Sequence, residues 1–191
     1  MLFKGLFLFL LSCLFLQKIR AQAEFAPGYI INTKHDTLWG EIKVNLKNQT
    51  ECFAKIYFRT KCDTSLSHGK PSPTRSYQAN KIDGFGFEGN NYSSVKLDNH
   101  WVFMITHCQG KICLFEYKAP VSSGNEKMES EYYVMKGGFE NLQIIAMDSK
   151  LKKHMKPFVS DDKILWKDFE KNNFDFGVVM QLISNYNERN K

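Results

Sequence analysis

Residues 102–117 read VFMITHCQGKICLFEY, which is the pattern of a β-hairpin. Apolar, β-branched and aromatic residues, which favour strands, lie on both sides of Gln109-Gly110, which is a turn sequence. The stretch therefore predicts two antiparallel strands, 102–108 and 111–117, joined as a hairpin.

The same pattern continues outward from this hairpin in both directions. Further strands are expected at 28–33, 38–45, 52–59, 80–88, 91–97, 132–136 and 142–146. Polar segments with Gly and Pro, 61–75 and 119–129, are expected to be loops, and Gly89-Asn90 is expected to be a tight turn. About eight short strands, mostly adjacent in sequence, predict an antiparallel β meander that forms a bent sheet or a partly open barrel.

Helical periodicity replaces the strand pattern after residue 148. Apolar residues recur at helical spacing over 151–158, 161–171 and 175–186, with Pro157 expected to break the first segment. Asp161-Asp162 and Asp175 are expected to cap helices, and the last helix carries one apolar stripe. The fold class is therefore α+β: one domain, 24–191, with a β-rich part at 24–147 and two or three helices at 148–191.

The first 23 residues have the pattern of a cleavable signal peptide. Lys4 precedes an apolar run at 6–16, and Ala21-Gln22-Ala23 supplies the small residues that signal peptidase needs. The run is shorter than the roughly 20 residues of a membrane-spanning helix. An uncleaved anchor and lipid attachment at Cys13 are the alternatives, although apolar residues continue after that cysteine. We expect an exported protein, periplasmic or extracellular, without a membrane span after cleavage.

The charge of the exported protein excludes a class of partners. Cleavage after residue 23 leaves 168 of the 191 residues and removes Lys4, Lys18 and Arg20 but no acidic residue, so the formal charge falls from +6 to +3. Such a charge supports neither nucleic-acid binding nor a polybasic membrane patch.

Four cysteines remain after cleavage, and an even number in an oxidising compartment favours disulfides. The candidates are Cys52, Cys62, Cys108 and Cys113. If the 108–113 hairpin has a four-residue loop, Cys108 and Cys113 lie opposite each other and can bond; with a two-residue loop they lie too far apart. In that case each pairs with Cys52 or Cys62, or stays reduced in the core.

Several short motifs resemble a family of small exported proteins of Bacteroidota that has no assigned activity. These are Gly28-Tyr29-Ile30, Asp36-Thr37 with Gly40-Glu41-Ile42, Gly110-Lys111-Ile112, and the ending Ser184-Asn185-Tyr186-Asn187. The resemblance spans most of the chain after residue 23 and implies the same order of strands and helices and an envelope location. It implies no catalytic or binding residues, and Cys113 stands where a serine is commoner.

No motif in the chain identifies a catalytic mechanism. The sequence contains neither Gly-x-Ser-x-Gly nor Cys-x-x-Cys, and its five histidines lack the spacing of a zinc hydrolase. His107, Cys108 and Cys113, completed by Cys52 or Cys62, are the one candidate zinc cluster, beside the alternative of disulfides or buried thiols. We expect no cofactor and no catalytic residue, while a hydrolase that assembles His100 or His107 with a carboxylate and a hydroxyl is the enzymatic alternative.

Aromatic residues on the expected strands are the feature that points to a function. They are Tyr29, Trp39, Phe85, Phe87, Tyr92, Trp101, Phe103, Phe115, Tyr117, Tyr132 and Tyr133. Buried, they fill a core; exposed together, they form a platform for sugars or a partner chain. We therefore expect a non-catalytic envelope or secreted module that binds a partner protein or a glycan, with a small apolar-ligand carrier as a further alternative.

Overall fold

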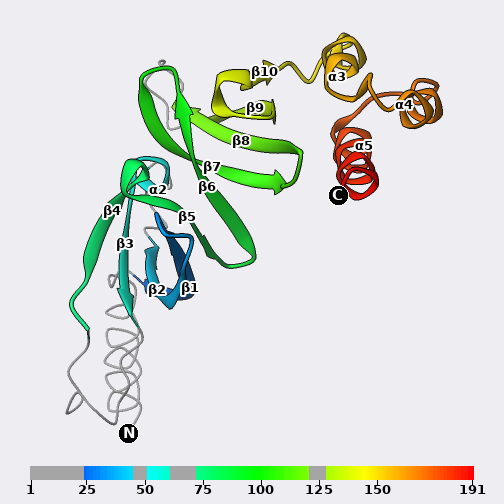
Figure 1. Cartoon of the computed structure of the whole chain (residues 1–191). Helices are drawn as coiled ribbons and strands as arrows, with labels where there is room; N and C mark the ends of the chain where they lie inside the picture. Colours follow the sequence, from blue (N-terminus) through cyan, green and yellow to red (C-terminus); the bar gives the residue numbers. More distant parts are fainter. Residues whose placement is uncertain (1–23, 45–50, 61–71, 121–127) are drawn as a thin grey trace, which may run out of the picture.

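The computed structural model describes residues 24–44, 51–60, 72–120 and 128–191, and the predicted signal peptide with Cys13 lies outside them (Figure 1). The described chain forms one antiparallel sheet followed by three helices, so the predicted α+β class is confirmed. The ten strands are β1 (Glu24–Asn32), β2 (Thr37–Val44), β3 (Lys55–Thr60), β4 (Arg75–Gln78), β5 (Ile82–Phe87), β6 (Asn90–Leu97), β7 (His100–Cys108), β8 (Ile112–Pro120), β9 (Met128–Lys136) and β10 (Gln143–Ile145).

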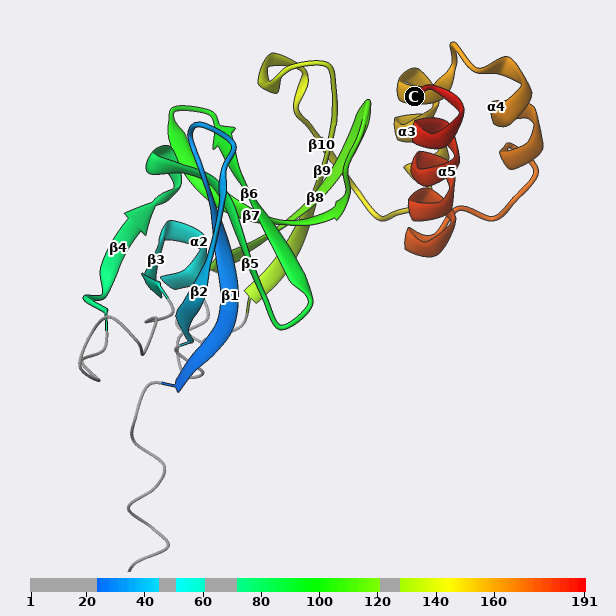
Figure 2. The same ribbon diagram turned by 60° about the horizontal axis from the view of Figure 1, so that its bottom comes forward.

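The sheet consists of two meanders joined back to back. Its order is β10-β9-β8-β7-β6-β5-β1-β2-β3-β4, so β1–β4 run outward in one direction and β5–β10 in the other. The first strand of each meander pairs with the other, with Tyr29 on β1 opposite Gly86 on β5. The sheet is bent and does not close, because β4 and β10 remain at its two ends (Figures 1 and 2).

The β1–β5 half has a core of its own. Successive side chains of a strand point to opposite faces, and the even-numbered residues of β1–β3 are the buried ones. This core contains Ala26, Ile30, Ile42, Ile56, Phe58, Ala79, Ile82, Phe85, Phe87 and Phe103. Two short elements lie beside it and bury one side chain each: Phe53 of α2 (Glu51–Ala54) and Ala79 of η2 (Ala79–Lys81).

Three helices cover the opposite half of the sheet. Helices α3 (Leu151–Val159), α4 (Lys163–Phe169) and α5 (Phe176–Arg189) group together, away from β3 and β4 (Figures 1 and 2). The predicted apolar stripe of α5 is confirmed: Val179, Leu182, Ile183 and Tyr186 are buried in one cluster with Ile112, Leu114 and Val134 of the sheet. Among the described residues, no helix is both long enough and apolar enough to cross a membrane.

The two predicted aspartate caps are confirmed. The side chain of Asp162 accepts a hydrogen bond from the backbone N–H of Leu165 at 3.0 Å, and Asp175 accepts one from Val178 at 2.8 Å. Each carboxylate satisfies an N–H group that has no partner within the first turn of a helix.

Asp161, which the sequence analysis grouped with the cap, instead links the helices to the sheet. Lys136 at the end of β9 donates hydrogen bonds to Asp161 Oδ2 and to the backbone oxygen of Phe158, both at 2.8 Å. The Tyr186 hydroxyl donates to the same Asp161 oxygen at 2.6 Å. These bonds from Lys136 and Tyr186 hold the pKa of Asp161 below its ordinary value.

Three expectations about element bounds are wrong. The strand expected at 52–59 begins only at Lys55, because α2 occupies the preceding residues. Strands β4, β8 and β9 extend into the ranges 61–75 and 119–129 that we expected to be loops. The residues of β4, Arg-Ser-Tyr-Gln, are mostly exposed at the sheet edge, so no alternation of apolar residues marks them.

Two local features also differ from expectation. The β5–β6 turn consists of Glu88 and Gly89 rather than Gly89-Asn90, and both have positive φ, 51° and 78°, as a type I′ hairpin requires. Pro157 does not break the first helix, because α3 continues to Val159. A proline this close to the end of a helix removes one backbone hydrogen bond without disturbing many later turns.

Candidate functional site: the recess beside Trp101

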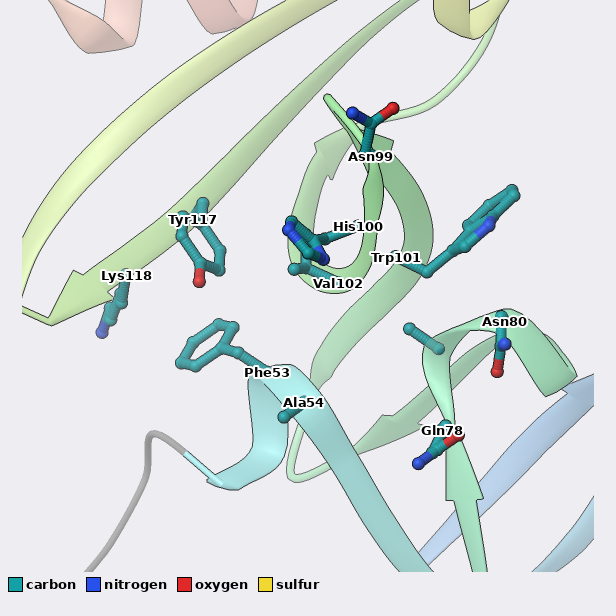
Figure 3. Close-up of a pocket in the computed structure, with 11 residues that line it drawn as sticks. Phe53, Ala54, Gln78, Asn80, Asn99, His100, Trp101, Val102, Tyr117 and Lys118 are labelled. Carbon is teal, nitrogen blue, oxygen red and sulfur yellow. The ribbon is translucent and has the colours of Figure 1, made fainter.

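A recess of about 420 Å³ lies between α2, η2 and the β6–β7 turn (Figure 3). Its lining combines aromatic side chains with side-chain amides. The aromatic residues are Phe53, Trp101 and Tyr117, and the amides are Gln78, Asn80 and Asn99. We refer to these six residues and the space between them as the Trp101 recess.

Trp101 stands at the mouth of this recess. It lies near the start of β7, opposite Lys96 of β6, and is 41% exposed. The ring of Phe139 packs against it in an edge-on contact, with ring centroids 5.9 Å apart. The indole is therefore held in place by a neighbouring ring and still presents surface to solvent.

Phe53 and Tyr117 form the opposite wall (Figure 3). Their rings meet at 85° with centroids 5.8 Å apart, which is the favourable edge-to-face arrangement. Burial, and then the nearby charge of Glu131, raise the pKa of Tyr117 above its ordinary value. The phenol therefore stays neutral near pH 7 and can both donate and accept hydrogen bonds.

A hydrogen bond to β6 fixes the element that carries the polar side of the recess. The Ser94 hydroxyl donates a hydrogen bond to the backbone oxygen of Ala79, which holds η2 against β6. Gln78 and Asn80, on either side of this anchor, are exposed and line the recess. Each amide offers a donor and an acceptor to a ligand.

A second recess of about 410 Å³ lies on the other side of Trp101. It shares Ala79, Asn80 and Trp101 with the first recess. Its wall includes His35 and Asp83, whose Nδ1 and Oδ2 atoms are 2.7 Å apart. One exposed indole therefore separates two adjoining hollows.

The aromatic residues expected from the sequence divide into core and surface. Phe85, Phe87, Phe103, Phe115 and Tyr133 are buried. Tyr29, Tyr92, Tyr117 and Tyr132 are partly buried, and only Trp39 and Trp101 are largely exposed. The platform alternative thus applies to the tryptophans and their neighbours, and core filling applies to the phenylalanines.

The structure also brings together a histidine, a carboxylate and a hydroxyl, as the hydrolase alternative requires. The carboxylate, however, lies between the other two groups. His107 Nε2 lies 2.8 Å from Glu116 Oε2, and the Ser130 hydroxyl donates to Glu116 Oε1 at 2.5 Å. The carboxylate separates the hydroxyl from the imidazole, whereas an activated serine must contact the imidazole itself. The ring of Phe176 on α5 contacts His107 and Tyr132 on one side of this cluster, and none of its three residues lines the Trp101 recess.

The charge of Glu116 is stabilised within this cluster. Burial alone would raise its pKa, but hydrogen bonds from Ser130 and His107 outweigh that effect and hold the pKa below its ordinary value. A β-bulge places His107 there, because the register between β7 and β8 shifts between Thr106 and Cys108. No signal in the sequence marks such a bulge.

The same bulge overturns both loop geometries that we considered for the cysteines. Cys108 lies opposite Leu114, so neither the two-residue nor the four-residue hairpin is present. Cys113, the neighbour of Leu114, points to the other face of the sheet, and both Cys108 and Cys113 are free. Cys62 and the side chain of Cys52 lie outside the described residues, so a disulfide between these two stays a prediction.

The candidate zinc cluster is not assembled by the described residues. Cys108 Sγ lies 3.8 Å from the backbone oxygen of Met180, while Cys113 Sγ contacts Gly110 O at 3.4 Å. Burial, and then Cys113, raise the pKa of the Cys108 thiol, which disfavours the thiolate that binds metals. Within 24–44, 51–60, 72–120 and 128–191, no three His, Cys, Asp or Glu side chains are placed to share a metal ion.

Comparisons with protein-family models, with curated proteins and with solved structures gave no match for this chain. The resemblance to exported proteins of Bacteroidota therefore stays an expectation.

Proposed function

We propose that this chain is a non-catalytic module of the cell envelope or the secreted fraction, and that the Trp101 recess binds a neutral oligosaccharide. The observation that carries the proposal is the exposed indole of Trp101 between two hollows lined by aromatic rings and amides.

The surface chemistry of the recess matches that of a sugar ring. A pyranose presents C–H groups on its face and hydroxyl groups around its rim. The indole of Trp101 offers a flat apolar surface for the C–H face. The amides of Gln78, Asn80 and Asn99 offer the donors and acceptors that the hydroxyl groups need.

The arrangement favours a chain of sugars over a single one. The two hollows lie on either side of Trp101 and share Asn80, so a ligand stacked on the indole extends into both. A compact metabolite would instead be largely enclosed by one concave site.

Aromatic and amide side chains outnumber charged ones in the first hollow. Among the described residues that line it, only His100 and Lys118 can carry a positive charge, and none is a carboxylate. The aromatic and amide groups therefore dominate recognition. The apolar-ligand alternative is less well supported, because Phe53 and the buried phenylalanines of the β1–β5 core already fill the bend of the sheet.

The test is a titration of the purified chain, from residue 24 onward, with neutral gluco-, manno-, xylo- and chito-oligosaccharides. Binding would be followed by tryptophan fluorescence and calorimetry. We expect at least one series to bind, with hexasaccharides binding more tightly than disaccharides. Trp101→Ala should weaken that binding about tenfold or more, because the substitution removes the stacking surface.

Trp39→Ala is the matched control, since Trp39 is also exposed but lies outside both hollows. Equal loss of binding in both variants, or no binding by any series, would contradict the proposal. Measurable hydrolysis of a bound oligosaccharide that is lost in His107→Ala would favour the hydrolase alternative instead.

Export is part of the proposal and has its own measurement. The intact mass of the protein purified from its own cells should correspond to a chain that begins at Glu24. A mass that begins at a lipid-modified Cys13 would place the protein on a membrane surface through its anchor.

A further inference from the structure

A third recess, of about 350 Å³, lies between the β1–β2 pair and the β5–β6 turn. Tyr29 and Trp39 form one wall, and the turn residues Glu88 and Gly89 lie at another. It shares no residue with the Trp101 recess or its neighbour. We refer to it as the Trp39 recess.

The two rings of this recess are held at a fixed angle. Tyr29 and Trp39 are direct cross-strand partners, with ring centroids 5.2 Å apart and planes inclined at 60°. The Tyr29 hydroxyl donates a hydrogen bond to Asn91 Oδ1 at 2.6 Å, which fixes the ring at its outer end. Trp39 is 70% exposed, so the corner between the rings opens to solvent.

Glycine creates the space beneath these rings. A Cβ atom at Gly86 would lie 2.5 Å from the ring of Tyr29, so only glycine allows that ring to lie across β5. Gly28, Gly40 and Gly89 also line the recess and contribute no side chain. The hollow is therefore preformed by the backbone.

Other aromatic rings on the same face of β1–β3 each have a cation from the chain itself. The guanidinium of Arg59 lies 3.8 Å from the ring centre of Phe25, and the ammonium groups of Lys43 and Lys55 lie 5.5 and 5.2 Å from that of Tyr57. Strand alternation places these rings on the face that also carries Tyr29 and Trp39. Among the described residues, no lysine or arginine occupies the corresponding position over Tyr29 or Trp39.

The charge of the lining points the same way. Among the described residues that line the Trp39 recess, Glu88 is the only charged one and none is basic. The faces of aromatic rings attract cations, most strongly for tryptophan. The recess therefore combines two aromatic faces and one carboxylate, with no positive charge to balance them.

We propose that the Trp39 recess binds a small quaternary ammonium group. Such a group needs no hydrogen-bond acceptor, which suits a lining in which Asn91 Oδ1 already accepts from Tyr29. Its methyl groups match the apolar surface of Tyr29, Trp39 and Pro27, and its charge is balanced by Glu88. The proposal does not depend on the glycan site.

The test compares choline with its uncharged isostere, 3,3-dimethylbutan-1-ol, by tryptophan fluorescence and by NMR of the indole N–H. Choline should bind saturably and about 3- to 30-fold more tightly than the isostere, which is the range expected for a cation over aromatic rings. Equal affinity for the two compounds would overturn the proposal, as would binding of neither.

Three variants locate the site. Trp39→Ala should abolish choline binding, and Glu88→Gln should weaken choline but not the isostere. Both residues are exposed, so neither substitution threatens the fold. Trp101→Ala is the control and should retain choline binding; its loss there, or its survival in Trp39→Ala, would assign choline to another place.

Discussion

The two halves of the sheet use the same kinds of residue for different purposes. In the β1–β5 half, apolar side chains and two short elements complete the core, and Trp39 on β2 and Trp101 on the nearby β7 remain at the surface beside recesses. In the β8–β10 half, three helices cover the sheet, and its reactive groups are engaged in contacts that hold the helices or the strands together. The exposed aromatic recesses and the helix attachment therefore lie in different parts of one sheet.

The helix-covered half shows why a cluster of reactive residues need not be an active site. His107, Glu116 and Ser130 are hydrogen-bonded to one another across β7, β8 and β9, and Glu116 is the buried member. A buried charge without such partners would be strongly destabilising. The Ser130 hydroxyl donates to Glu116 and does not contact the imidazole of His107, so these bonds do not form a serine–histidine pair.

The largest expected effect comes from weakening the contact between helix α5 and the sheet. Leu182→Ala removes a fully buried side chain of α5 and leaves a cavity against the sheet. The free energy of unfolding should fall by about 2–5 kcal/mol. Urea unfolding followed by circular dichroism measures this change. Ile144→Ala, at a position that is 59% exposed, is the control and should change stability by less than about 0.5 kcal/mol.

The next effect tests the glycine beneath Tyr29. In Gly86→Ala, the new methyl group must displace the Tyr29 ring and its hydrogen bond to Asn91, at a cost of about 1–3 kcal/mol. The double variant Tyr29→Ala/Gly86→Ala should be no less stable than Tyr29→Ala alone. If the two losses add in a double-mutant cycle, the steric explanation is wrong.

A smaller, pH-dependent effect tests the Glu116 cluster. Glu116→Gln should cost about 1 kcal/mol near pH 7, because charge-assisted hydrogen bonds become neutral ones. The pKa of Glu116 is lower in the folded protein than its ordinary 4.5. Its stabilising contribution is therefore complete above about pH 4.5 and is lost as the pH falls through the lower, folded-state value.

Unfolding measurements on the wild type and Glu116→Gln between about pH 7 and pH 3 check this dependence. The gap in stability should close toward the acid end. Glu129→Gln, at an exposed position on β9, should show no such closing gap. A constant gap for Glu116→Gln would mean that the charge of Glu116 contributes nothing.

The smallest expected effect is the loss of stability when either exposed tryptophan is replaced. Trp101→Ala and Trp39→Ala should each lower the free energy of unfolding by only about 0.5 to 1 kcal/mol, because each exposed indole loses one ring contact, with Phe139 or Tyr29. Thermal unfolding of the two variants checks this prediction. A loss above about 2 kcal/mol in either variant would make that tryptophan a structural residue and weaken its assignment to a ligand.

Local patterns predicted much of this architecture. The alternation in 102–117 and in the strands around it, the caps at Asp162 and Asp175 and the stripe from Val179 to Tyr186 all follow from contacts within a few residues. The edge strand β4 escaped prediction because an exposed strand has no face to bury.

The candidate site was only partly predictable. The abundance of aromatic residues on strands indicated a core or a platform, but not which rings do which. That division depends on the pairing of β1 with β5, which lies 50 or more residues away along the chain, and on η2 lying beside Trp101.

The α+β class, most of the elements and the supply of aromatic and amide side chains follow from local sequence, because they depend on composition, periodicity and turn chemistry over short distances. The positions of the histidine, cysteine and tryptophan side chains depend instead on contacts between distant segments of the chain. The bulge at Thr106–Cys108 turned His107 toward Glu116 and separated the two cysteines. The packing of the helices over one half of the sheet, and of short elements against the other, left Trp39 and Trp101 at the surface.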